Sequence, residues 1–208
     1  MTAAEVHDCS IDTPPAGWPP LQVLALFPPI QPGAAPALVR ASAQGMARQV
    51  LMQRAGAETP AQWQELPRAA RGARSVSFSH EAGASLLAWC ATGAIGVDLV
   101  DLDSLALASQ QELAATAALY LGPIEAAAVA AAPQASEARL RFAVGWASLE
   151  ARLKCLGLEL DEWQSARADS LDSTAVVQVF VPDRDAQISG RWIGCAAWWA
   201  DPQRRSVQ

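Results

Sequence analysis

A strand-length apolar run with a carboxylate at its centre constrains the fold of this chain more than any other feature. Residues 95–101 read Ile-Gly-Val-Asp-Leu-Val-Asp, and Asp98 lies inside this run. Burying a carboxylate is costly unless a cation or hydrogen-bond donors compensate it, so Asp98 requires a partner from elsewhere. Gly96 predicts that a ligand or a second backbone approaches the strand closely. The structural alternative is helix capping, a role open to Asp101 or Asp103 before the next helix.

The only lysine of the chain, Lys154, supplies a cation of a kind that the sequence uses nowhere else. Trp146, Glu150 and Lys154 are spaced by four residues, which places them on one stripe of the helix expected over residues 137–156. Because arginine provides all the other basic side chains, this position indicates a requirement for a compact ammonium group. The alternative is an ordinary surface Glu–Lys pair, which stabilises a helix only slightly.

A third polar element ends a short apolar strand. Residues 77–80 read Ser-Phe-Ser-His, and His80 is one of two histidines in the chain. A histidine at the end of a strand is often a hydrogen-bonded structural group, so His80 becomes a candidate site residue only in combination with other polar groups.

Composition narrows the class of protein. The chain has 208 residues, is 51% hydrophobic and carries a net charge of −6, which argues against binding nucleic acid through a broad basic surface. Six arginines nevertheless lie between residues 37 and 75 against two glutamates, which indicates either a local anion site or a solvated basic helix face. The four cysteines show no metal-ligand spacing, and no signal peptide or membrane span is evident. We therefore expect a soluble, cytoplasmic protein.

The periodicity of apolar residues predicts an α+β fold. Strands are expected at 21–27, 76–79, 85–90, 94–100, 175–180 and 192–199, and helices at 38–55, 105–119, 124–132 and 137–156. Residues 91–93, Ala-Thr-Gly, indicate a hairpin between two of the strands. Gly157 is expected to end the last helix.

Three segments follow from this pattern. Proline-rich residues 1–20 are expected to form a loose lead-in, followed by an N-terminal α+β half over 21–103 and a C-terminal α+β half over 104–208. Residues 86–91 and 193–198 are both small, apolar and tryptophan-bearing, which suggests a duplicated architecture.

In this order and spacing, three motifs resemble the 4'-phosphopantetheinyl transferase superfamily. They are Ser-Phe-Ser-His at 77–80, Gly-Val-Asp at 96–98 and Trp-x-x-x-Glu-Ala-x-x-Lys at 146–154. Residues 120–125 and the Arg-Gln-Val-Leu segment at 48–51 are also similar to family segments, and the likeness spans roughly residues 38–200. The length is similar to that of the surfactin-synthetase-activating type. The resemblance implies a monomeric pseudo-dimer of two similar α/β-sandwich halves with the active site at their junction.

The resemblance also implies a reaction and a set of residue roles. Such enzymes transfer the 4'-phosphopantetheine arm of coenzyme A to a serine of an apo acyl or peptidyl carrier protein, with Mg²⁺, and release 3',5'-ADP. Asp98 and Glu150 are the implied magnesium ligands, and Glu150 and Lys154 the implied catalytic residues. Contacts to coenzyme A are implied for Arg48, Arg71, Arg74, Ser79, His80 and Lys154. No nucleic-acid or membrane partner is expected.

Two positions depart from the family pattern and leave alternatives open. Val100 stands where the surfactin-type enzymes usually have an acid, and Leu149 stands where they commonly have a lysine. The first alternative is a non-catalytic relative that binds coenzyme A or a carrier protein. The second is an unrelated α+β interaction protein in which every motif is structural.

Overall fold

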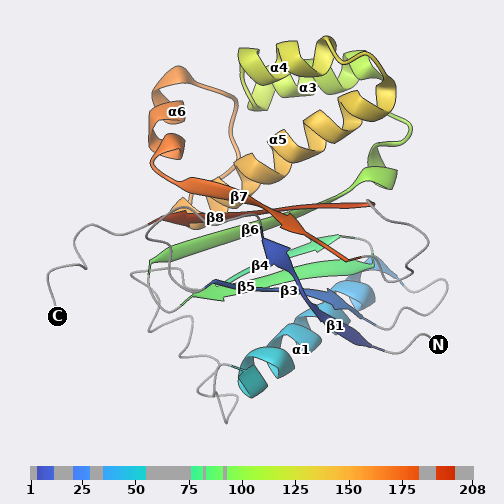
Figure 1. The fold of residues 1–208 in the computed structure, drawn as a ribbon, viewed down its shortest axis with the longest axis vertical. Coiled ribbons are helices and arrows are strands. Elements are labelled where there is room, and N and C mark those ends of the chain that lie inside the picture. The colour runs from blue at the N-terminus through green and yellow to red at the C-terminus, as the bar shows by residue number, and fades with distance from the viewer. Residues whose placement is uncertain are drawn as a thin grey trace, which may run out of the picture.

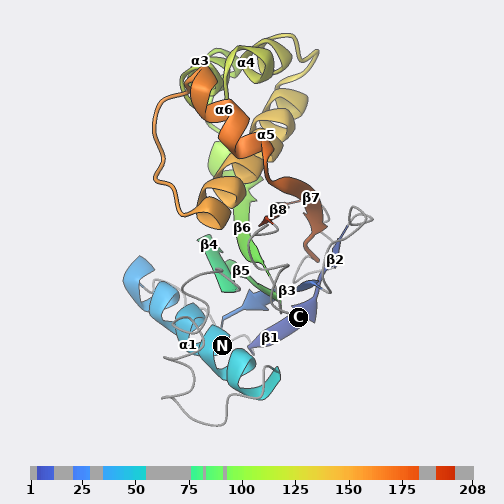
Figure 2. The same cartoon turned by 90° about the vertical axis from the view of Figure 1, so that its left-hand side faces the viewer.

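The computed structural model describes residues 4–11, 21–28, 35–54, 76–81, 83–90, 93–182 and 191–199. Figure 1 shows four layers: a single helix, a first sheet, a second sheet and a group of helices. Turned by 90°, Figure 2 shows α1 (Pro36–Arg54) on one side of the sheets and the remaining helices on the other. The expected α+β class is confirmed.

Among the described residues, each sheet has four strands, and all the neighbouring strands are antiparallel. The first sheet has the order β1-β3-β5-β4, formed by Glu5–Asp8, Leu21–Phe27, Ala84–Cys90 and Val76–Glu81. The second has the order β2-β7-β8-β6, formed by Ser10–Ile11, Ala175–Phe180, Trp192–Trp199 and Ala94–Asp101. The edge strands β4 and β6 carry the polar motifs found in the sequence.

The connectivity of the two sheets is alike. In the first, the chain runs β3, α1, β4, β5, and the last strand, β5, lies between the other two. In the second, it runs from β6 through the helical layer to β7 and β8, and β8 lies between β7 and β6. The two similar segments noted in the sequence, 86–91 and 193–198, thus belong largely to β5 and β8, the central strands of this repeated connectivity.

The helical layer above the second sheet consists of one 3-10 helix and four α-helices. These are η1 (Leu102–Leu105), α3 (Gln110–Tyr120), α4 (Pro123–Ala130), α5 (Ala135–Leu156) and α6 (Ser165–Asp172). Ser109 and Glu112 form a capping box that starts α3, and Gly157, at φ 72°, ends α5 as expected. Within the described part of the chain, no helix has the length and apolar character of a transmembrane segment.

The largest apolar core lies between the sheets. It contains side chains from both, including Phe27, Leu86, Ile95 and Leu99. Smaller cores join α1 to the first sheet and α5 to the second. Because β6 is buried along its whole length, one of its faces contacts the inter-sheet core and the other contacts α5. This double contact places Asp98 beneath α5.

The four cysteines are free, and three of them are buried. Burial raises the pKa of Cys9 and of Cys195 to about 12, so these thiols stay protonated at neutral pH. They act as small apolar side chains.

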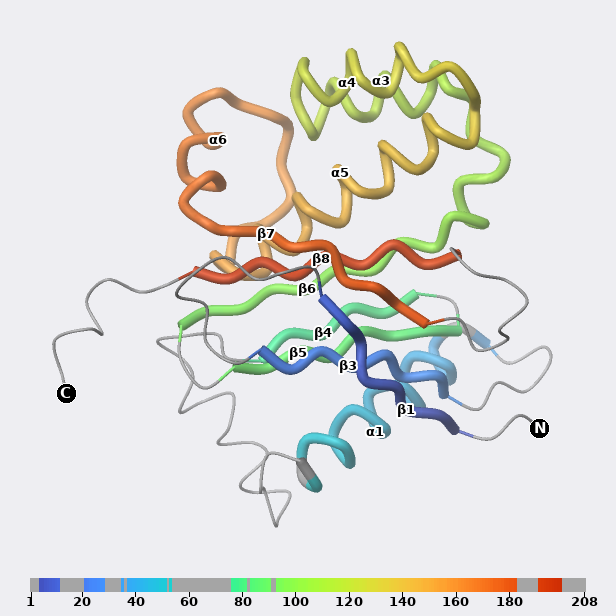
Figure 3. The backbone as a smooth tube through the Cα atoms, viewed as in Figure 1, coloured from blue at the N-terminus to red at the C-terminus, as the bar shows by residue number. Residues whose placement is uncertain are grey.

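The hairpin expected between residues 85–90 and 94–100 is wrong. Figure 3 shows β5 and β6 in different layers, since β5 pairs with β3 and β4 while β6 pairs with β8. Turn residues between two strands can join neighbouring strands of one sheet or strands of two different sheets. Both connections reverse the chain direction, so the turn residues alone do not distinguish them. In sheet pairing, β6 therefore groups with the C-terminal strands, although the sequence assigned it to the half over 21–103.

The expectation of a loose lead-in over residues 1–20 is wrong for part of that segment. Glu5–Asp8 forms β1, which pairs with β3, and Ser10–Ile11 forms β2, which pairs with β7. Half-buried and exposed residues alternate in β1, so its strand character comes from edge pairing rather than from apolar content. The short α6 was also not expected, since none of its residues is buried and it carries no apolar stripe.

Candidate active site at the junction of the two sheets

The edge strands of the two sheets meet, and serine hydroxyls join them. The Ser77 hydroxyl accepts a hydrogen bond from the Val97 backbone N–H at 2.9 Å. The Ser79 hydroxyl donates to Asp98 Oδ1 at 2.7 Å. Alternation along β4 directs both serines toward β6, so the two motifs from separate parts of the sequence lie side by side. We call this contact between β4 and β6 the seam.

A glycine brings α5 close to the seam. A Cβ added at Gly96 would clash with the Ala151 carbonyl oxygen and lie 2.5 Å from the Cys155 backbone nitrogen. On the facing side of α5, Ala143, Ala147 and Ala151 are fully buried. Small residues on both elements therefore allow the backbones to approach, which confirms that Gly96 admits a second backbone. This close approach places Glu150 and Lys154, which lie on the neighbouring face of α5, next to Asp98.

The partner that Asp98 requires is Lys154. Its ammonium donates to Asp98 Oδ1 at 2.6 Å, to the Val97 carbonyl oxygen at 3.2 Å and to the Ser79 hydroxyl at 3.2 Å. Asp98 is only 6% exposed, so this ion pair and the Ser79 bond compensate a buried charge. The lone lysine is therefore part of a triad with Asp98 and Ser79, which excludes the simple surface Glu–Lys pair as its role.

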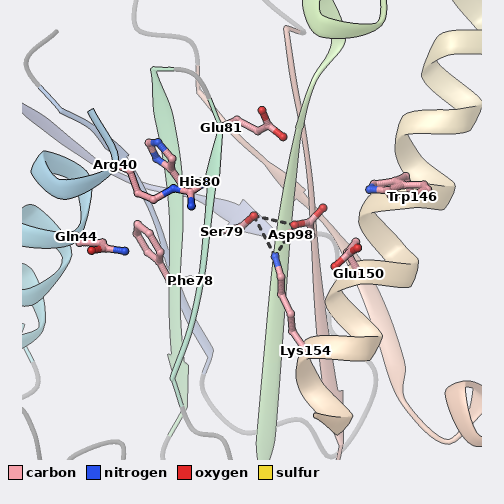
Figure 4. A pocket seen from close by; sticks show the side chains of 10 residues that line it. All are labelled: Arg40, Gln44, Phe78, Ser79, His80, Glu81, Asp98, Trp146, Glu150 and Lys154. Atoms are coloured by element: carbon pink, nitrogen blue, oxygen red, sulfur yellow. Dashed lines mark hydrogen bonds and ion pairs between the residues drawn. The ribbon is translucent and has the colours of Figure 1, made fainter. Parts of the chain in front are cut away.

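Glu150 is the second acid of the site. Figure 4 shows its side chain pointing from α5 toward Asp98. Burial raises the pKa of Glu150, the negative charge of Asp98 raises it further, and Lys154 opposes the change. The pKa remains raised because one ammonium shared between two carboxylates does not offset both burial and repulsion. Lys154 alone therefore does not balance the negative charge of Asp98 and Glu150 together.

The triad and Glu150 open into a cavity of about 390 Å³. Figure 4 shows the side chains that line it from α1, β4, β6 and α5, namely Arg40, Gln44, Phe78, Ser79, His80, Glu81, Asp98, Trp146, Glu150 and Lys154. Five of the sequence-predicted site residues, Ser79, His80, Asp98, Glu150 and Lys154, thus converge on one cavity.

His80 occupies the α1 end of this cavity. It follows Ser79 on β4, so the two side chains leave opposite faces of the strand. The His80 Nδ1 atom lies 2.7 Å from the hydroxyl of the buried Ser85, which orients the ring. Burial lowers the pKa of His80, and the nearby Arg40 guanidinium lowers it further. The folded protein therefore favours the neutral imidazole of His80, and Arg40 supplies the positive charge at this end.

Of the three predicted arginines, the one that the structure describes does not lie at the cavity. Arg48 is exposed on α1, two turns beyond Arg40, and does not line the cavity. Arg71 and Arg74 lie outside the described residues. Sequence reasoning missed Arg40 and Gln44 as site residues. Their spacing of four along an expected helix was visible, but the direction in which that helix docks on the sheet was not.

The donor set suits a hard divalent cation. Within the described ranges no cluster of three or more His, Cys, Asp or Glu side chains is found that would hold a metal by itself. Asp98 and Glu150 instead form a pair of carboxylates next to a polar cavity, and Mg²⁺ commonly uses one or two carboxylates together with water and substrate phosphate. The unbalanced negative charge at Glu150 fits such an ion.

The sequence matches no protein-family model and no curated protein. The resemblance to phosphopantetheinyl transferases therefore depends on the sequence motifs, three of which meet at this site.

Proposed function

We propose that this protein is a Mg²⁺-dependent 4'-phosphopantetheinyl transferase that acts on an apo acyl or peptidyl carrier protein. The observation that carries this proposal is the convergence of Asp98, Glu150 and Lys154 in one cavity with His80 at its far end. Transfer of a group from a pyrophosphate requires acids that can bind a metal ion or accept a proton. It also requires positive charge to stabilise the phosphates, which Lys154 and Arg40 can supply here.

The proposed reaction transfers the 4'-phosphopantetheine arm from coenzyme A to a serine of the carrier protein. The serine oxygen of the carrier forms a bond to the β-phosphorus of coenzyme A, and the bond from that phosphorus to the bridging oxygen breaks. The released group is 3',5'-ADP, and the serine proton goes to Glu150, directly or through water. Lys154 neutralises negative charge on the departing phosphate. Asp98 and Glu150 would hold Mg²⁺, whose role when bound is to polarise the pyrophosphate oxygens.

The remaining contacts of coenzyme A follow from charge. Its 3'-phosphate is proposed to lie toward His80 and Arg40, where a guanidinium can form charge-assisted hydrogen bonds. Arg48, Arg71 and Arg74 stay candidates for phosphate contacts. The repeated strand connectivity supports the further proposal of a monomeric pseudo-dimer, with this cavity at the junction of its halves.

The direct test is the incubation of apo carrier proteins with coenzyme A, Mg²⁺ and this protein, followed by intact mass measurement. We expect a mass gain equal to the phosphopantetheine arm. Glu150→Gln should slow the transfer by about 100-fold or more, since it removes a general base. Glu159→Gln, at an exposed position beyond α5, removes the same charge outside the cavity and should leave the rate unchanged. The absence of any mass gain across several carriers would contradict the proposal.

A second candidate is a non-catalytic relative that binds coenzyme A or a carrier protein. It is favoured by Val100, which is 6% exposed and contacts the apolar face of α5 where an acid of the surfactin-type pattern would stand. Calorimetry with coenzyme A separates the two functions. Heat that depends on added Mg²⁺ supports the enzyme, whereas binding of coenzyme A without any effect of Mg²⁺ supports the non-catalytic relative.

A further inference from the structure

We propose that Ser79 is a positioning residue that holds Asp98 and Lys154 in their working geometry, rather than a residue that contacts coenzyme A. The inference rests on the proposed function for its catalytic consequence, but the hydrogen-bonded triad itself does not depend on it. The family resemblance implies that Ser79, like His80, contacts coenzyme A, and the geometry points to a different task.

The geometry of Ser79 is that of a link between two charged groups. Its hydroxyl donates to Asp98 Oδ1 at 2.7 Å and accepts from the Lys154 ammonium at 3.2 Å. A hydroxyl can donate and accept at the same time, so one side chain connects the acid of β6 to the cation of α5. The single O–H proton of Ser79 is thus committed to Asp98 and is not available for donation to a phosphate oxygen.

This link determines which oxygen of Asp98 is available. In the described part of the chain, both the Ser79 and the Lys154 hydrogen bonds of this carboxylate fall on Oδ1. These bonds restrict the rotation of the carboxylate, and Oδ2 is the oxygen that would hold a cation together with Glu150. Residues that orient a metal-binding carboxylate in this way typically change metal affinity by about 10- to 100-fold when they are removed.

The chain provides a matched control on the same strand. Ser77 precedes Ser79 by two residues, faces β6 in the same way and is similarly buried at 9% exposed. Its hydroxyl bonds the Val97 backbone rather than a charged side chain. Ser77→Ala therefore weakens the seam without removing a bond to Asp98 or Lys154, whereas Ser79→Ala removes both bonds.

The first measurement does not need catalysis. Because the chain has a single lysine, ¹³C-lysine labelling gives one side-chain Cε resonance, which reports on Lys154. We expect Ser79→Ala to shift this resonance, and Ser77→Ala to leave it in place. Ser79→Thr keeps the hydroxyl and should restore the wild-type position. Equal spectra for the two alanine variants would overturn the proposal.

The second measurement uses transfer kinetics with apo carrier protein. We expect Ser79→Ala to raise the Mg²⁺ concentration needed for half-maximal rate by about tenfold. The KM for coenzyme A should stay within about twofold, because no contact to that substrate is lost. A raised KM for coenzyme A with unchanged Mg²⁺ dependence would instead establish the phosphate-contact role and overturn the inference. Absence of transfer by the wild type, together with the lysine shift in Ser79→Ala, would refute the proposed function and leave the triad standing.

Discussion

Arg40 affects the charge state of His80, the imidazole at the α1 end of the cavity. Burial is the main cause of the lowered His80 pKa, and the positive charge of Arg40 is the second. Because the folded protein disfavours the protonated ring, the stability contributed by neutral His80 is present above its ordinary pKa of 6.5. That stability is lost as the pH falls through 6.5 toward the lowered value.

We predict that Arg40→Gln raises the pKa of His80 part of the way back toward 6.5, since burial persists and only the repulsion disappears. Proton NMR of the ring Cε1–H measures this, and the chain has only one other histidine, His7, to assign. Arg48→Gln is the matched control, because Arg48 lies on the same helix but does not line the cavity. An equal change in both variants would contradict a specific effect of Arg40.

At this scale, residue type and spacing predicted five of the side chains that meet at the cavity. Asp98 could be recognised as a charged residue within an apolar strand, and Lys154 as the one lysine of the chain. The pairing between them was not predictable, since it depends on how α5 crosses β6. The bond between Ser79 and Asp98 was missed for the same reason, because it forms across two sheets rather than along one strand.

Among the elements, α5 has the most exacting position, because its backbone lies directly over Gly96 of β6. We predict that Gly96→Ala destabilises the protein by about 1–3 kcal/mol, as an added methyl group forces α5 away from the strand. It should also separate Lys154 from Asp98 and change the single lysine resonance. Urea unfolding gives the first quantity and NMR the second.

The matched control is Gly45→Ala in α1, where an added methyl group meets nothing within 4 Å. Alanine favours a helix over glycine, so this variant should be neutral or more stable by up to about 1 kcal/mol. If Gly96→Ala were as stable as Gly45→Ala, the close contact between α5 and β6 would be disproved.

Most elements were predictable from periodicity, and the exceptions have a common cause. The strands at 21–27, 175–180 and 192–199 were expected with their observed bounds because they are mostly apolar segments of strand length. In contrast, β1 and α6 expose much of their surface and depend on neighbouring elements, which a local pattern does not contain. The assignment of β5 and β6 to different sheets likewise depends on partners distant in the sequence.

For the whole molecule, the core between the sheets predicts cooperative unfolding. Leu99 is 1% exposed in this core, which draws side chains from both sheets. We expect Leu99→Ala to cost about 2–5 kcal/mol, and Leu107→Ala, at a 99% exposed position, to stay within about 0.5 kcal/mol of the wild type.

Both variants are measured by chemical denaturation, followed in parallel by tryptophan fluorescence and far-UV circular dichroism. Coincident transitions are expected, because neither sheet retains a complete core without the other. Two separated transitions would show that the sheets unfold independently.

The seam between β4 and β6 has a mechanical consequence. A backbone ladder permits only shifts by whole residues, because every bond of the ladder must break and re-form together. Hydroxyl groups tolerate small displacements, since they rotate to follow their partners. A slight shear of the first sheet along the second therefore changes how Ser79 meets Asp98 and Lys154, while the ion pair between β6 and α5 and the backbone ladders of both sheets stay intact.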